Sequence, residues 1–254
     1  MSGPIVTIGA VRFYGDRYRG PGVPHIGPNE SDFDGFLDSL RAEFDDQRRP
    51  TMGLYDVEAY YPARFPHMSG FASTKTHSEL EALRRHIIGL NRRGKRQVMV
   101  EVGHDWFTLT AEVVNVTWDQ ASFAPEAVWS VDLRCVDPLK RGELRTYTAP
   151  ATVFHRGRFD ALPTVTVRAT TAMSGYTING PDGKRFIVTS PLPAGATDTI
   201  DFATGWVYRG GALLEKATSR SETWPVPPGT GIAMSLTPTT GAGVLTVKVH
   251  DTDL

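Results

Sequence analysis

The side chains best able to do chemistry are one cysteine and a few histidines, and their spacing does not assemble a reactive site. Cys135 is the single cysteine, so neither an intramolecular disulfide nor a cysteine-based metal cluster can form. It falls on the apolar phase of an expected strand, with no motif pairing it to a histidine, which predicts a small buried hydrophobe. His77 and His86 lie nine residues apart on one expected helix, whereas zinc ligands on a helix face need an i,i+4 spacing.

Glycine and carboxylate patterns give no catalytic signal either. GTG at 229–231 and GAG at 241–243 lack the third glycine and the helix of a dinucleotide loop, so both are predicted to be turns. Asp251 and Asp253 lie near the C-terminus, where we expect solvated carboxylates on a fraying tail. We therefore predict no enzyme, and no catalytic, cofactor-binding or metal-binding residues; a small hydrolase acting on the cell envelope is a competitor without a supporting motif.

Two groups of residues are better suited to binding. A basic patch on and after one expected helix could contact nucleic acid, an acidic partner or a neighbouring protein; the alternative is a solvated face whose last arginines favour the helix dipole. Its candidate interface residues are Arg84, Arg85, Arg92 and Arg93. Trp206 and Trp224 are candidate glycan contacts because aromatic rings stack on sugars, although core packing is the competing use.

Composition favours a β-rich globular protein. Of 254 residues, 40% are hydrophobic and 22% charged, which suffices for a sizeable core. Lys plus Arg (27) nearly balances Asp plus Glu (28), so no global charge points to nucleic acid or membrane. The 25 glycines and 18 prolines disfavour a helix-rich fold. No signal peptide or membrane-spanning run is evident, so we expect a soluble protein made in a reducing cytoplasm.

The first half contains strands and one or two helices. Residues 4–14 are an expected strand, and apolar residues at helical spacing predict a short amphipathic helix from about residue 33 until Pro50. A clearer helix is expected over 77–92, capped by Thr76 or Ser78 and closed by Gly94.

Three strands then follow the clearer helix. The apolar phase of 106–118 slips by one residue, which predicts a bulge near Val113. The closing strand at 127–136 alternates strictly, with Trp129, Val131, Leu133 and Cys135 on one face.

The sequence pattern changes after the polar segment 139–150. Short strands with closely spaced turns continue to the end, which is typical of a β-sandwich or barrel. In DTIDFATGWVYRGGALL (198–214), alternation and glycine turns predict a meander with Gly205 at positive φ. We place a domain boundary near residue 149.

The order of motifs in both halves resembles a known family. The first half carries, in order, ARFPHMSGFAST, SELEALRRHIIGLNRRG, QVMVEVGHDWFTLTAEVVNVTW and VWSVDLRCVDP. The second half carries an entry at Gly157, Ala161 and Pro163, a hairpin at Asp201, Gly205, Val207, Tyr208 and Gly211, and a turn at Trp224, Pro225, Pro227, Pro228 and Gly229. Over roughly residues 60–254 this order is similar to the siphophage distal tail (minor tail) protein family with a galectin-like C-terminal domain.

The resemblance implies a mainly β fold with one or two helices. Residues 1–149 would be a tail-tube-like, ring-forming β domain carrying helix 77–92, and residues 150–254 a galectin-like β-sandwich. The helix and the strands 97–118 and 127–136 would build the ring body. The first sixty residues depart from the family pattern, and we expect an insertion at 20–50 that could itself dock a neighbouring tail protein.

The resemblance also implies a structural role in a virion. Such proteins form a ring, typically a hexamer, at the distal end of the tail, between the tail tube protein and the tail-tip hub or receptor-binding proteins. DNA would be only passing cargo, no membrane partner is expected, and synthesis would occur in the host cytoplasm. The alternative is a carbohydrate-binding protein that recognises host-surface glycans through Trp206 or Trp224.

Overall fold

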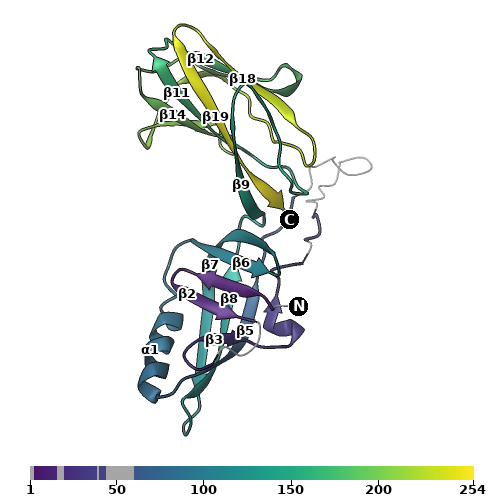
Figure 1. The fold of residues 1–254 in the computed structure, drawn as a ribbon, viewed down its shortest axis with the longest axis vertical. Helices are drawn as coiled ribbons and strands as arrows, with labels where there is room; N and C mark the ends of the chain where they lie inside the picture. Colours follow the sequence, from purple (N-terminus) through teal and green to yellow (C-terminus); the bar gives the residue numbers. More distant parts are fainter. Residues whose placement is uncertain (1–2, 16–19, 39, 44–59) are drawn as a thin grey trace, which may run out of the picture. The chain divides into compact units, whose positions relative to one another are not determined.

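The computed structural model describes residues 3–15, 20–38, 40–43 and 60–254. It divides into two compact units, Met1–Lys140 with Leu254, and Arg141–Asp253 (Figure 1). Most described elements are strands, and the described ranges contain one α-helix, α1 (His77–Ile88), so the expected mainly β class is confirmed. None of the helices in these ranges is long and apolar enough to cross a bilayer.

The strands of the first unit close into a barrel. Pairing runs from β1 to β2, β3, β5, β8, β7 and β6, and β6 returns to β1. The described strands of this unit are β1 (Ile5–Ile8), β2 (Val11–Tyr14), β3 (Pro24–Ile26), β4 (Phe33–Asp34), β5 (His67–Ser73), β6 (Arg96–Val102), β7 (Asp105–Gln120) and β8 (Glu126–Arg134). β4 adds to β5 beside this ring of pairs. Closure covers the polar edges that an open sheet would expose.

The barrel closes because β7 changes partner along its length. Its first half pairs with β6, and its second half pairs with β8. The register shifts between Val113 and Asn115, and the extra residue, Val114, is exposed. The predicted bulge is therefore confirmed, and it returns Val116 and Trp118 to the core side, where they pack against the buried cluster.

The helix α1 packs one apolar stripe on this barrel. Thr76 caps it, its Oγ1 accepting a hydrogen bond from the Glu79 N–H at 3.2 Å. Leu80, Ile87 and Leu90, three of the apolar residues at helical spacing within 77–92, are buried. The predicted end at residue 92 is wrong: the helix ends at Ile88, and the Leu90 N–H bonds the Ile87 carbonyl at 3.0 Å, a tighter turn that carries Leu90 into the core.

The start of the chain differs from the sequence-based expectation. The single strand expected over 4–14 is a hairpin, β1–β2, which turns at Gly9 with φ +61°. No helix forms at 33–38 or 40–43, because Phe33 joins β4 and Gly35 has φ +71°, outside helical geometry. The rest of the expected helix, towards Pro50, lies outside the described residues.

The 20–50 segment contributes to the barrel wall where it is described. β3 and β4 both pair with β5, the short 3-10 helix η1 (Glu30–Asp32) lies between them, and Phe36 is fully buried against Phe33 in a stacked pair with 4.6 Å between ring centroids. These residues are thus integral to the first unit. Residue 39 and residues 44–50 lie outside the described part.

A buried arginine holds this segment to the end of β8. The Arg64 Nη1 donates to the carbonyls of Gly35 at 3.0 Å and Asp38 at 2.8 Å. The backbone of Arg64 pairs in both directions with that of Cys135. Burial lowers the pKa of the Arg64 guanidinium. The hydrogen bonds to the two carbonyls compensate part of the hydration that the guanidinium loses.

The second unit is a sandwich of two sheets. One sheet has the order β16-β15-β14-β11-β19-β9, and the other β10-β18-β12-β13-β17. Their bounds are β9 (Lys140–Thr148), β10 (Ala151–Val153), β11 (Thr164–Thr171), β12 (Tyr176–Asn179), β13 (Arg185–Val188), β14 (Thr197–Asp201), β15 (Trp206–Arg209), β16 (Ala212–Leu213), β17 (Thr218–Ser221), β18 (Ile232–Pro238) and β19 (Ala242–Asp253). The expected meander at 198–214 is confirmed as β14–β15–β16, with Gly205 at φ +71°.

The division between the units falls earlier than the boundary expected near residue 149. The polar segment 139–150 forms β9, which lies next to β19 in the first sheet of the sandwich. The residues of β9 are mostly exposed or of intermediate burial. The segment therefore lacks the alternation of apolar and polar residues by which a strand is recognised in a sequence.

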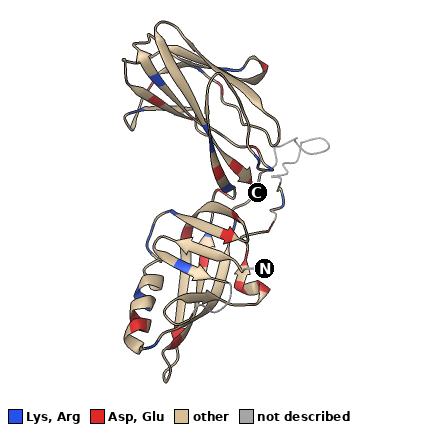
Figure 2. Cartoon of the chain, viewed as in Figure 1, with Lys and Arg blue, Asp and Glu red and all other residues tan. Residues whose placement is uncertain are grey.

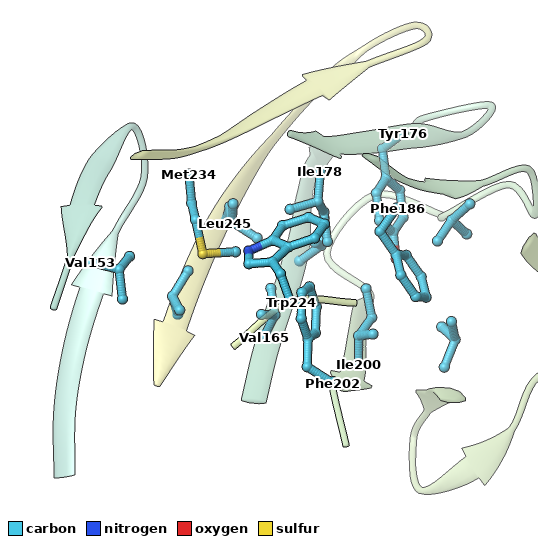
Figure 3. Packing of buried hydrophobic residues seen from close by; sticks show 14 of the residues in the cluster. Val153, Val165, Tyr176, Ile178, Phe186, Ile200, Phe202, Trp224, Met234 and Leu245 are labelled. Atoms are coloured by element: carbon cyan, nitrogen blue, oxygen red, sulfur yellow. The ribbon is translucent and has the colours of Figure 1, made fainter. Parts of the chain in front are cut away.

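Trp224 is central to the core of the sandwich. Its ring meets Phe202 edge-on, with 4.9 Å between centroids, and lies among side chains from both sheets, including Ile178 and Leu245 (Figure 3). Gly180 touches the indole so closely that a Cβ there would overlap the ring. The core therefore requires a glycine at 180 and an indole at 224 together.

A buried charge cluster joins three strands of the sandwich. Asp198 on β14 is fully buried and accepts two hydrogen bonds from Arg209 on β15, at 2.7 and 3.1 Å. The Tyr176 hydroxyl on β12 donates to the same carboxylate at 3.0 Å. Burial and the neighbouring carboxylate raise the pKa of Tyr176, so the phenol stays protonated and donates. The cluster therefore links the two sheets.

The C-terminal carboxylates are structural, which corrects the expectation of a fraying tail. Asp251 lies on β19 and accepts hydrogen bonds from Arg145 Nε at 2.7 Å and Nη2 at 2.8 Å. It also accepts one from the Arg156 backbone N–H at 2.7 Å, and Asp253 accepts one from the Arg158 N–H at 2.8 Å. The pair of carboxylates thus fixes the chain at 156–158 against the last strand.

The loss of stability on replacing Asp251 should depend on pH in a defined direction. The Arg145 hydrogen bonds hold the pKa of Asp251 below its usual 3.8, so its stabilising contribution is present above the unfolded-state pKa and is lost as pH falls through the folded-state pKa. We expect Asp251→Asn to lower the free energy of unfolding by about 1–3 kcal/mol at pH 7. Urea titrations should show this difference shrinking as the pH is lowered below the usual carboxyl range. The exposed Asp160→Asn is the control, and a pH-independent difference would contradict the account.

Candidate functional site

The predicted interface arginines are all exposed and belong to two elements. Arg84 and Arg85 lie on the outward side of α1, and Arg92 and Arg93 lie in the turn that follows it. Arg84 makes a loose ion pair with Glu81 at 3.3 Å, and both signs of charge occur along the helix (Figure 2). An exposed pair of this kind contributes at most about 1 kcal/mol to stability, so changes here test binding more than folding.

The outward face of α1 also presents an apolar residue. Arg84, Arg85 and Ile88 share one side of the helix through their i,i+3 and i,i+4 spacing. Ile88 is 40% exposed, whereas Ile87 next to it is fully buried. We call Arg84, Arg85 and Ile88 the helix face. The sequence indicated the charge of this face but not its exposed isoleucine. Two adjacent isoleucines, Ile87 and Ile88, both look like residues of a buried apolar stripe.

A second surface lies on the outer side of the barrel near the β7–β8 turn. Asp119, Val128 and Phe71 stand in one row across β7, β8 and β5, in direct register. Val128 is 57% and Phe71 40% exposed, and the surface beside them is hollowed by about 600 Å³. Glu126 is exposed, lies on the same face two residues before Val128, and also lines the hollow. We call this surface the β5–β8 hollow.

The turn beside the hollow ends in an exposed aromatic ring. Phe123 lies in the segment between β7 and β8 and is fully exposed, at 100%. Backbone hydrogen bonds from Thr74 N–H to the Pro125 carbonyl and from Ala121 N–H to the Glu126 carbonyl, both 2.9 Å, fix the base of this turn.

The arrangement nearest to a catalytic group is a histidine–aspartate pair on the same outer face. The ring Nδ1 of His67 lies 2.6 Å from an oxygen of Asp132, which also accepts a hydrogen bond from Asn115 at 3.1 Å. The His67 hydrogen bond lowers the pKa of Asp132. The neighbouring hydroxyls bond elsewhere, Ser69 to Asp32 at 2.7 Å and Ser130 to Thr117 at 2.7 Å. Within the described residues, neither of these hydroxyls is hydrogen-bonded to the His67–Asp132 pair. The pair joins β5 to β8.

Cys135 is inert, as its strand phase predicted. The side chain is fully buried, and burial raises the pKa of the thiol to about 11, so the nucleophilic thiolate is scarce at neutral pH. Among the described residues no group of three or more His, Cys, Asp and Glu side chains is placed to hold a metal ion.

The two candidate glycan contacts have opposite environments. Trp224 is 1% exposed, so its prediction as a glycan contact is wrong; its ring belongs to the core. Trp206 is 53% exposed, because it pairs with Asp201 on the outward phase while its neighbour Val207 pairs with Ile200 on the inward phase. Tyr208 lies on the same side, with 6.5 Å between the ring centroids. The structure therefore does not bring the two tryptophans to one surface.

No protein-family model and no curated protein matches this sequence. Solved structures do match its fold. The SPP1 Dit (gp 19.1) protein, described as a paradigm of the hub adsorption apparatus in phages that infect Gram-positive bacteria, is similar at a TM-score of 0.67 and 15% identity. The likeness covers 87% of this chain and 92% of that one.

A second similar structure is a chain of the phage P2 baseplate in its activated conformation with Ca. Its TM-score is 0.50 at 8% identity, and the likeness covers 96% of this chain and 97% of that one. At such identities the comparisons establish a shared fold. The resemblance that the motif order indicated is thereby confirmed as a likeness of fold to phage tail-tip proteins.

The two tryptophans give a matched pair of substitutions. We expect Trp224→Ala to lower the free energy of unfolding by about 3–5 kcal/mol, because it empties the centre of the sandwich core. Trp206→Ala removes a half-exposed ring, so its effect should stay below about 1 kcal/mol. Denaturant titrations of both variants measure the difference. Equal effects would contradict the inward and outward assignment of the two rings.

The thiol should react only after unfolding. With Cys135 buried and its pKa raised, an aromatic disulfide reagent at neutral pH should release almost no thiolate from the native protein and one equivalent in guanidinium chloride. Rapid labelling of the native protein would show that the end of β8 opens to solvent.

Proposed function

We propose that this chain is a distal tail protein of a phage with a long, non-contractile tail, and that it acts as a structural component of the tail tip. The observation that carries the proposal is the two-unit fold shared with the SPP1 Dit protein over 87% of this chain. The motif order in the sequence points to the same family independently.

The proposal assigns a separate task to each unit. The barrel with α1 is the tail-tube-like, ring-forming unit, which contacts further copies of itself and the tail tube protein. The sandwich, with facing sheets of six and five described strands, is galectin-like and projects towards the tail-tip hub or receptor-binding proteins. We propose six copies per ring and a lumen through which DNA passes. Trp224 is buried, so glycan binding would depend on Trp206 alone.

Location in the virion tests this function directly. Antibodies raised against the purified chain, visualised with gold in negative-stain images of the phage that carries it, should label the distal end of the tail. Antibodies against the tube protein, which should label the tail along its length, are the control. Labelling of the head, or of the whole length of the tail, would contradict the proposal.

A further inference from the structure

Two surfaces of the first unit complement each other in charge and in apolar content. The helix face offers Ile88 beside the cations Arg84 and Arg85. The β5–β8 hollow offers Phe71 and Val128 beside two carboxylates, Asp119 and Glu126. Each surface thus has an apolar centre with charges at its margin, which is the composition of a protein interface core and rim.

The charges that would meet are available for a partner. In the described part of the chain, Arg85, Asp119 and Glu126 take part in no ion pair, and Arg84 has only its loose contact with Glu81. An arginine brought to either carboxylate would form a charge-assisted hydrogen bond at the margin of the apolar centre. Opposite charges on the two surfaces would also orient the approach.

The helix face cannot reach the hollow of its own barrel. Gln120 lines the hollow, and its side-chain nitrogen lies 3.5 Å from the His77 ring at the first turn of α1, so the helix begins beside the hollow. Ile88 lies eleven residues further on, about 16 Å away at 1.5 Å per residue. The buried Leu80 and Ile87 fix the helix to its own barrel, so the partner must be another molecule.

We propose that the helix face of one copy docks in the β5–β8 hollow of the next copy. Ile88 packs on Phe71 and Val128, and Arg84 and Arg85 pair with Asp119 and Glu126. The inference rests on the proposed function, because it names the contact between neighbouring subunits of the ring. Two different surfaces that meet head to tail generate a directional chain, which closes into a ring when the rotation per subunit allows.

Charge-reversed variants of the full chain test the contact. The helix variant carries Arg84→Glu and Arg85→Glu, and the hollow variant carries Asp119→Lys and Glu126→Lys. Sedimentation velocity should show self-association of the wild type and a loss of about tenfold or more in affinity for either variant alone. An equimolar mixture should associate again, since the reversed helix face fits the reversed hollow and the two unchanged surfaces fit each other.

The control reverses charges on the other unit. Arg185→Glu with Glu215→Lys, both exposed, should leave association unchanged, and circular dichroism should show that every variant is folded. Wild-type self-association that either variant retains, or a mixture that stays as weak as its components, overturns the contact. A wild type that never self-associates overturns it too. The proposed function is decided separately, by the position of the gold label on the virion.

Discussion

The bulge in β7 is the constraint on which the first unit depends. A single strand pairs with β6 in its first half and with β8 in its second, and the extra residue Val114 keeps apolar side chains directed inward on both sides of the change. Without that residue the second half would face the wrong way, placing Val116 and Trp118 in solvent and Asp119 in the core. The outward row of Asp119, Val128 and Phe71, and therefore the β5–β8 hollow, exists because the bulge restores the phase.

The second unit depends on a different constraint, the contact between Gly180 and Trp224. One large ring fills the space between the sheets only because its neighbour lacks a side chain. Elsewhere in this unit Arg209 binds Asp198, and Arg145 binds Asp251. Such internal pairing favours a rigid module, in agreement with the structural role proposed above.

Much of the fold was predictable because it is encoded in short periodic patterns. Strict alternation fixed the inward face of β8, and the slip of one residue located the bulge. The buried stripe of α1 followed from its helical spacing, although its end did not, since the tight turn at Gly89 is shaped by the burial of Leu90. These features need information from only a few neighbouring residues.

The rest required pairings between distant segments. The hollow forms where Phe71 meets Val128 across two strands, and nothing in either local pattern shows that both lie outward together. Arg64 could not be recognised as buried, because the carbonyls that hold it come from residues 35 and 38. The two tryptophans looked alike in sequence, and only the register of β15 with β14 and the packing at Gly180 separate them.

The most direct test of the account is a cryo-electron microscopy map of the distal end of the tail. The account predicts a closed ring of copies coaxial with the tube, in which the barrel of each copy forms the ring body and the sandwich lies on its outside. A map with the chain present as a single copy, or with the sandwiches lining the lumen and the barrels outside, would contradict it.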